Sequence, residues 1–224
     1  MDWSALRLSL ELAAWTTAIL VPVGVLIGRA LAWRRFVAKS VIEALIALPL
    51  VLPPTVLGFY LLVAFGSASP LGRVYEALVG QPLVFTFQGL LFASLIFNLP
   101  FAVQPIQRAF ESLPKDIREA AWCCGMSPWH TFRRIEFPLV WTGILSAIVL
   151  TFAHTLGEFG VVLMVGGNIP GETQTVAIAI YDRVQALEEQ QAAVMSAILL
   201  GFSFVTISFI YLLNNRTENH RGGQ

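Results

Sequence analysis

The sequence predicts an all-α integral membrane protein with five transmembrane helices. Hydrophobic residues make up 56% of the chain and charged residues 12%, about half the charged share of a soluble domain, and the mean hydropathy is +0.72. Five long stretches are almost free of charge, and each reaches the ~17–25 apolar residues that a membrane helix needs. We therefore expect one domain over residues 1–224, with spans at about 8–33, 42–66, 84–107, 138–165 and 191–214.

The basic residues predict the orientation of these spans, because Lys and Arg in short loops concentrate on the cytoplasmic side. With five spans the two termini lie on opposite faces. An outer N-terminus leaves eleven of the fourteen basic residues inside, which predicts an N-out, C-in topology. The inner residues are Arg29, Arg34, Arg35, Lys39, Arg108, Lys115, Arg118, Arg133, Arg134, Arg216 and Arg221, and the outer ones are Arg7, Arg73 and Arg183.

A polar segment at about 111–136 separates the third and fourth spans, and its residues predict two short helices joined by a turn. Pro114 fits a first helical position, and Gly125 fits the left-handed residue that ends a helix. Ser127 and Pro128 then suit the cap and first position of a second helix. Apolar residues of the first helix recur at helical spacing, at Ile117, Ala120, Ala121 and Cys124.

Six residues in or next to this segment have a characteristic spacing: Glu119, Ala120, Ala121, Gly125, Ile135 and Pro138. They resemble the EAA motif of ABC importer permeases. The spacings agree, and the one departure is Phe137, where the family usually has leucine. The resemblance implies a type I importer permease fold in a bacterial inner membrane, and a coupling helix that contacts a cytoplasmic ATP-binding subunit.

A helix that lies in the membrane interface is the alternative interpretation of this segment, because an amphipathic pattern suits both a coupling helix and an interfacial helix. A basic polar face would favour the interfacial helix. The first helix instead mixes Lys115 and Arg118 with Asp116 and Glu119.

Two further segments carry a second resemblance: residues 48–58, and residues 157–160 together with 166–173. They resemble the molybdate permeases, whose relatives carry sulfate or tungstate. The resemblance implies a subunit that passes an oxyanion, molybdate first and tungstate or sulfate as alternatives, from a periplasmic binding protein to the cytoplasm. It also implies a second permease copy, so that a homodimer frames one path through the lipid.

Prolines 49, 53 and 54 predict a break in the second span, because they remove backbone donors from a membrane helix. Such a break can line a pathway, and a simple packing kink is the alternative. The candidate pathway or gate residues are Pro53, Pro54, Thr55, Gly157, Glu158 and Gly160.

Glu158 is an acidic residue between apolar stretches, and His154 lies one helical turn earlier. A carboxylate would repel an oxyanion, so we expect a structural role: pairing with His154, capping nearby backbone, or a protonated state. A proton relay is the alternative.

The segment at about 166–190 is expected on the outer face, where it begins with turn residues and continues as a helix of mixed charge. We expect it to receive the binding protein through Asn168, Glu172 and Asp182. An ordinary solvated connection is the alternative.

Other classes of function have less support. The chain lacks the phosphate loop of ATPases, so ATP hydrolysis is assigned to a partner subunit and no catalytic residue is expected. An ion-coupled secondary transporter would show repeated halves and central charges, and a membrane enzyme would need clustered polar residues, which the histidines at 130, 154 and 220 do not supply.

The adjacent cysteines Cys123 and Cys124 have no metal-ligand spacing, so no metal or cofactor is expected. The zero net charge gives no argument for nucleic acid.

Overall fold

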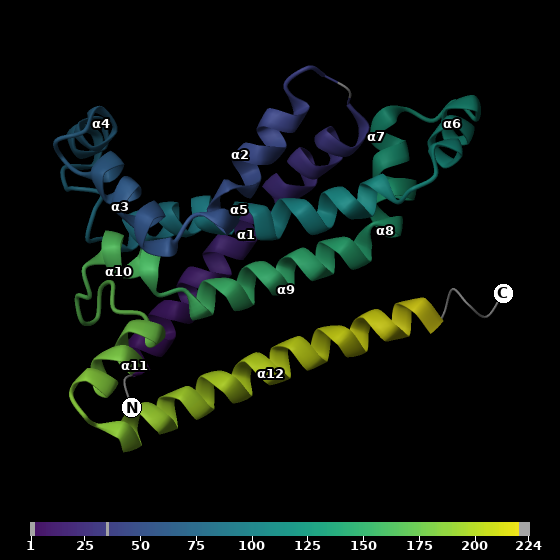
Figure 1. Ribbon diagram of the computed structural model, residues 1–224. Coiled ribbons are helices and arrows are strands. Elements are labelled where there is room, and N and C mark those ends of the chain that lie inside the picture. Colours follow the sequence, from purple (N-terminus) through teal and green to yellow (C-terminus); the bar gives the residue numbers. More distant parts are fainter. Residues whose placement is uncertain (1–2, 35, 220–224) are drawn as a thin grey trace.

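The computed structural model describes residues 3–34 and 36–219, and of residues 206 and 209–219 it describes the backbone alone. Arg35, His220 and Arg221 lie outside the described residues, and the side chain of Arg216 is likewise not described. Within the described residues all regular elements are helices (Figure 1). They are α1 Trp3–Trp33, α2 Lys39–Val51, α3 Pro54–Phe65, α4 Pro70–Val79, α5 Phe87–Glu111, α6 Lys115–Cys123, α7 Pro128–Thr131, the π-helical η1 Phe132–Glu136, α8 Phe137–Leu139, α9 Trp141–Gly157, α10 Gly160–Gly166, α11 Val176–Gln185 and α12 Glu189–Asn219.

Two helices, α1 and α5, are each long and apolar enough to cross a membrane unbroken. The expected second span consists of α2 and α3, which meet at an angle of 111°. The helix of residues 128–139 likewise meets α9 at 68°, so the described residues hold up to four spans if each bent pair counts as one. The five-span count and the N-out orientation therefore remain predictions.

Small residues allow α1, α5 and α9 to pack closely along most of their length. A Cβ atom on Gly24 of α1 would lie 3.0 Å from the carbonyl oxygen of Ala102, and one on Gly28 would lie 2.9 Å from the backbone nitrogen of Gln107. Gly143 of α9 faces α5 in the same way, against Ala109. Side chains at this contact form one buried cluster, made of Val25, Ile106, Phe110, Val140, Ile144 and Ala147.

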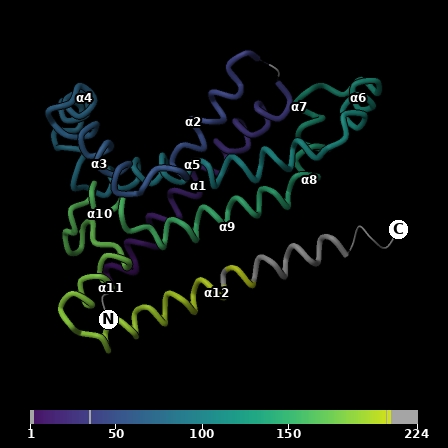
Figure 2. Tube along the Cα trace, in the orientation of Figure 1, coloured from purple at the N-terminus to yellow at the C-terminus, as the bar shows by residue number. Residues whose placement is uncertain are grey.

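A second packed region joins α3 to α10, where Gly58 leaves room for Val161 and Met164. The described part of α12 contacts α11 and α9, and its Met195 packs with Ala5 of α1 and with Val176 and Ala179 of α11 (Figure 2). Over its described part, α12 exposes large apolar side chains such as Leu200 (72%) and Phe204 (71%). This surface is suited to lipid or to another membrane helix.

Candidate functional site

The turn between α6 and α7 forms as the sequence predicts. Gly125 has a φ of +76°, and its N–H donates to the carbonyl oxygen of Trp122 (2.9 Å). The N–H of Met126 donates to the carbonyl oxygen of Ala121 (3.1 Å), which completes a Schellman motif. A Cβ on Gly125 would meet no atom within 4 Å, so the backbone conformation alone favours glycine here.

The second helix also begins where it was expected. The Ser127 hydroxyl accepts the N–H of His130 (3.4 Å), and Pro128 takes the first helical position. The first helix differs from prediction by one residue: Pro114 is the N-cap rather than the first helical residue, because its ψ of 135° is extended.

Continuing the chain, α7 passes into the π-helical turn η1, in which the N–H of Phe137 donates to Phe132. The sequence analysis did not predict this turn.

The predicted coupling residues lie at one end of the molecule, beyond the ends of α5 and α9 (Figure 1). Glu119 and Ala120 are exposed, whereas Ala121 is on the buried face of α6. Gly125 is exposed in the turn, and the rings of Trp122 and Trp129 are 46% and 64% exposed. The last two motif residues lie on the following helix, with Ile135 half-buried and Pro138 exposed.

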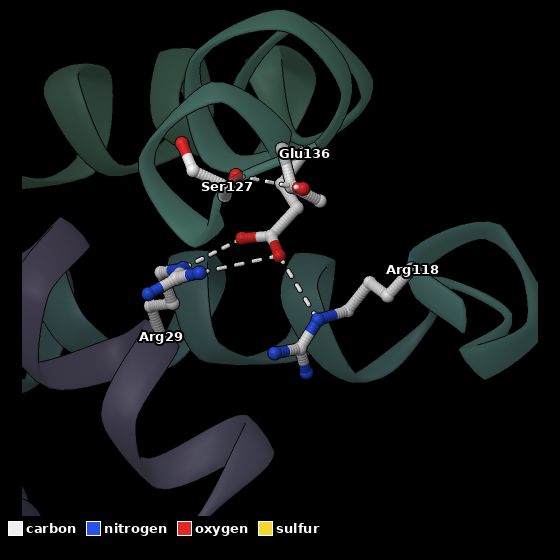
Figure 3. Close-up of polar contacts among 5 residues, drawn as sticks. Arg29, Arg118, Ser127 and Glu136 are labelled. Carbon is white, nitrogen blue, oxygen red and sulfur yellow. Dashed lines mark hydrogen bonds and ion pairs between the residues drawn. The ribbon is translucent and has the colours of Figure 1, made fainter. Parts of the chain in front are cut away.

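Beside the turn, the buried carboxylate of Glu136 binds two arginines from distant parts of the chain (Figure 3). Glu136 is 1% exposed. Its Oε2 accepts from Nε of Arg29 (2.6 Å), and its Oε1 accepts from Nη2 of the same guanidinium (3.2 Å). Nε of Arg118 forms an ion pair with Oε1 at 3.0 Å.

Aromatic rings hold both guanidinium groups in place. Arg29 lies over the ring of Phe132 at 5.1 Å, and Arg118 lies over the rings of Trp33 (4.2 Å) and Trp122 (4.9 Å). Burial lowers the pKa of the Arg118 guanidinium, the charge of Arg29 acts in the same direction, and the Glu136 carboxylate opposes both. Arginine keeps its proton in proteins, so the cluster holds two cations against one anion.

The breaks in the second and fourth apolar segments face each other. A Cβ on Gly160, at the start of α10, would lie 2.8 Å from Cβ of Pro54 and 3.5 Å from the nitrogen of Thr55. Pro53, Pro54 and Thr55 are exposed. Gly157 is exposed too, and a Cβ on it would meet nothing within 4 Å.

Glu158 and His154 have separate partners. The Glu158 carboxylate is 5% exposed and accepts the N–H of Val161 (2.9 Å), which is the backbone-capping alternative. His154 stacks on Phe101, with ring centres 3.9 Å apart, and its Nδ1 lies 3.0 Å from Oδ1 of the fully buried Asn98. The break after α9 is thus stabilised by its own carboxylate.

Two of the three outer residues bind each other. Nδ2 of Asn168 donates to Oδ2 of Asp182 (2.9 Å), and Nε2 of Gln174 donates to both side chains (2.9 and 3.0 Å). These bonds fix the loop onto α11. The third residue, Glu172, is exposed and lines a pocket of about 600 Å³ together with Arg7.

Residues 21–219 match the family described as the binding-protein-dependent transport system inner membrane component. The chain belongs to this family.

Curated relatives of this family member cover nearly its whole length. The molybdenum transport system permease protein ModB of Azotobacter vinelandii is 49% identical over 210 residues, which are 94% of this chain and 93% of the relative. The protein of the same name from Escherichia coli K12 is 32% identical, over 92% and 90% of the two chains. A probable sulfate transport system permease protein cysT of Chlorella vulgaris is 29% identical, over 92% of this chain and 77% of its own.

Solved structures share the fold at much lower identity. A bacterial ABC transporter involved in the import of the acidic polysaccharide alginate superposes with a TM-score of 0.79 at 15% identity, covering 95% of this chain and 78% of the other. The alginate transporter in complex with a periplasmic protein gives 0.78 at 16% identity, over 96% and 78%. The all-helical, type I ABC permease-like fold is therefore established for this family member.

Sequence analysis of this inner membrane component missed Glu136 and its two arginines. The available signal was a single acidic residue between the apolar Ile135 and Phe137, next to a motif that was already recognised. Among the described residues no cluster of His, Cys, Asp and Glu side chains has the geometry of a metal site.

Proposed function

We propose that this chain is the membrane-spanning permease subunit of an ATP-driven importer that passes molybdate from a periplasmic binding protein to the cytoplasm. The observation that carries the proposal is the 49% identity, over nearly both full lengths, with a relative named as a molybdenum transport permease. The subunit is non-catalytic, and it lies in a bacterial inner membrane as a five-span, N-out and C-in protein.

In this proposal the segment from Lys115 to Pro138 receives force from a cytoplasmic ATP-binding subunit. The exposed Glu119 and Ala120, the turn at Gly125 and the open rings of Trp122 and Trp129 support this role, since they offer a polar and aromatic surface at one end of the molecule. Ala121, Ile135 and Pro138 would keep this surface in register with the helices behind it.

The pathway would pass the two facing helix breaks, at Pro53, Pro54 and Thr55 on one side and Gly157, Glu158 and Gly160 on the other. A second copy of the chain would face these breaks and complete the path. The Glu158 carboxylate is occupied by the backbone of α10, which supports a structural role rather than contact with an anion.

On the outer face we propose that Glu172 contacts the binding protein directly. Asn168 and Asp182 bind each other, so their part would be to hold the receiving loop in shape.

Reconstitution in lipid vesicles tests the proposed function. Vesicles that contain this chain, the ATP-binding subunit and the binding protein should accumulate molybdate only when ATP is present on the cytoplasmic side. Tungstate and sulfate offered as competitors decide among the oxyanions. Uptake driven by an ion gradient, without the ATP-binding subunit, would contradict the proposal and favour a secondary transporter.

A further inference from the structure

The cluster of Glu136, Arg29 and Arg118 connects three elements that the predicted coupling motif does not connect. Arg29 belongs to α1, Arg118 to α6, and Glu136 to the π-helical turn before α8 and α9 (Figure 3). Glu136 is separated from Arg29 by 107 positions in the sequence. One buried carboxylate thus joins the coupling segment to the first span.

Arg118 is the side chain through which α6 reaches this joint. Its guanidinium contacts α1 in two ways, through Glu136 to Arg29 and directly over the Trp33 ring at 4.2 Å. Its own helix supplies Trp122 on the guanidinium at 4.9 Å. Ring contacts of this kind restrict a long side chain that would otherwise move freely.

The burial of Glu136 makes the connection stiff. At 1% exposure, the carboxylate would be left as an uncompensated buried charge if it lost its arginines, which is strongly destabilising. Glu136 is the last residue of the π-helical turn, and its carboxylate lies between the two arginines (Figure 3). Such turns are frequent at functional sites.

We propose that Glu136 is a positioning residue that transmits displacement of α6 to α1 through the chain Arg118–Glu136–Arg29. This inference rests on the proposed function as an ATP-driven importer. In it, the ATP-binding subunit moves α6, and the buried ion triad obliges the cytoplasmic end of α1 to follow.

The test compares variants in vesicles with the ATP-binding subunit and the molybdate-loaded binding protein. Three quantities are measured: the amount of ATP-binding subunit that copurifies, the rate of ATP hydrolysis, and the molybdate taken up per ATP hydrolysed. The variants are Glu136→Gln, which removes the charge at constant shape, and Arg118→Met, which frees α6 while the Arg29–Glu136 pair remains. Glu43→Gln is the matched control, because Glu43 also binds a cation, Lys39 at 3.7 Å, but its side chain is 35% exposed.

Both test variants should retain the ATP-binding subunit and hydrolyse ATP, yet take up less molybdate per ATP by roughly 2- to 30-fold, the range of substitutions along a coupling network. The variant with both substitutions should lose little more uptake per ATP than the stronger single variant, because each of the three chains lacks the same connection between α6 and α1. The control should stay within about twofold of the wild type.

An Arg118→Met chain whose uptake per ATP stays within about twofold of the wild type overturns the inference, even if Glu136→Gln fails to fold. An equal loss in the Glu43→Gln control overturns it too. Failure of the proposed function is a different result, in which the wild-type chain itself shows no ATP-dependent uptake of molybdate.

Discussion

At the scale of single residues, Gly125 offers a direct test of the coupling turn. Its φ of +76° costs a residue with a Cβ roughly 1–2 kcal/mol, although there is open space around it. Gly125→Ala should therefore lower the thermal midpoint of the detergent-purified chain and reduce the amount of copurified ATP-binding subunit. Gly125→Asn should be milder, because asparagine tolerates the left-handed region.

Gly80 provides the matched control for this prediction. It ends α4 with a φ of +81°, also with nothing within 4 Å, so the backbone cost of Gly80→Ala is the same. Because α4 and α6 lie at opposite ends of the molecule (Figure 1), the Gly80→Ala chain should lose stability and still copurify the ATP-binding subunit. Equal copurification from the two alanine variants would show that the turn at Gly125 has no special part in docking.

The contrast between Gly125 and Glu136 shows what could be predicted from the sequence at this scale. The requirement for glycine is local, since a Schellman turn is specified by the few residues around it. The partners of Glu136 are set by tertiary packing, because Arg29 lies 107 positions away and its pairing depends on how α1 and α9 cross. The sequence indicates a charged residue there, but not what it binds.

At the scale of helices, one break was predicted and the other was not. Three prolines mark the end of α2, whereas the break at Glu158 and Phe159 contains none, and the sequence analysis expected one continuous span over residues 138–165. The bend of 111° between α2 and α3 could not be predicted from the local sequence, since α3 packs at Gly58 against α10, which is about a hundred positions further along the chain. The position of the proline break after α2 can therefore be predicted from the local sequence, whereas the size of the bend cannot.

The close contact of α9 with α5 yields a prediction about packing. A Cβ on Gly143 would overlap Ala109 and lie 3.0 Å from the carbonyl oxygen of Pro105, so Gly143→Val must push two helices apart. We expect a loss of about 1–3 kcal/mol in the free energy of unfolding, as for other overpacked sites. Thermal unfolding of the purified chain in detergent measures it.

Gly201→Ala is the control for Gly143→Val. A Cβ on this glycine of α12 meets nothing within 4 Å, and alanine is the better helix former, so stability should stay constant or rise slightly. An unchanged midpoint for Gly143→Val would mean that α5 and α9 do not pack as closely as the structure has them.

At the scale of the whole molecule, the fold is retained where the sequence has changed. The alginate transporter chain superposes with a TM-score of 0.79 although only 15% of residues are identical. Apolar helices of suitable length satisfy a membrane with many sequences, so the path of the chain can persist while the side chains that face a substrate differ. Substrate assignment therefore depends on the closer relatives and on measurement.

The orientation of the whole molecule can be measured with the native cysteines. Cys123 and Cys124 are the two cysteines of the sequence, and both are exposed beside the predicted coupling turn. If the chain is N-out and C-in, a membrane-impermeant maleimide should label them in inside-out vesicles and leave them unlabelled in right-side-out vesicles. The chain is expressed without the proposed ATP-binding subunit, so that docking does not shield the thiols.

The opposite face of the membrane is tested in the same two kinds of vesicle with a variant that carries a single cysteine at another position. Replacing both cysteines by serine and introducing Ser67→Cys places a thiol of nearly the same size in the exposed connection between α3 and α4. This connection follows the second predicted span, so its thiol should react only in right-side-out vesicles. Residues that are labelled from opposite sides must be separated by an odd number of membrane crossings. If the native cysteines and the cysteine at position 67 were labelled from the same side, the predicted topology would be ruled out.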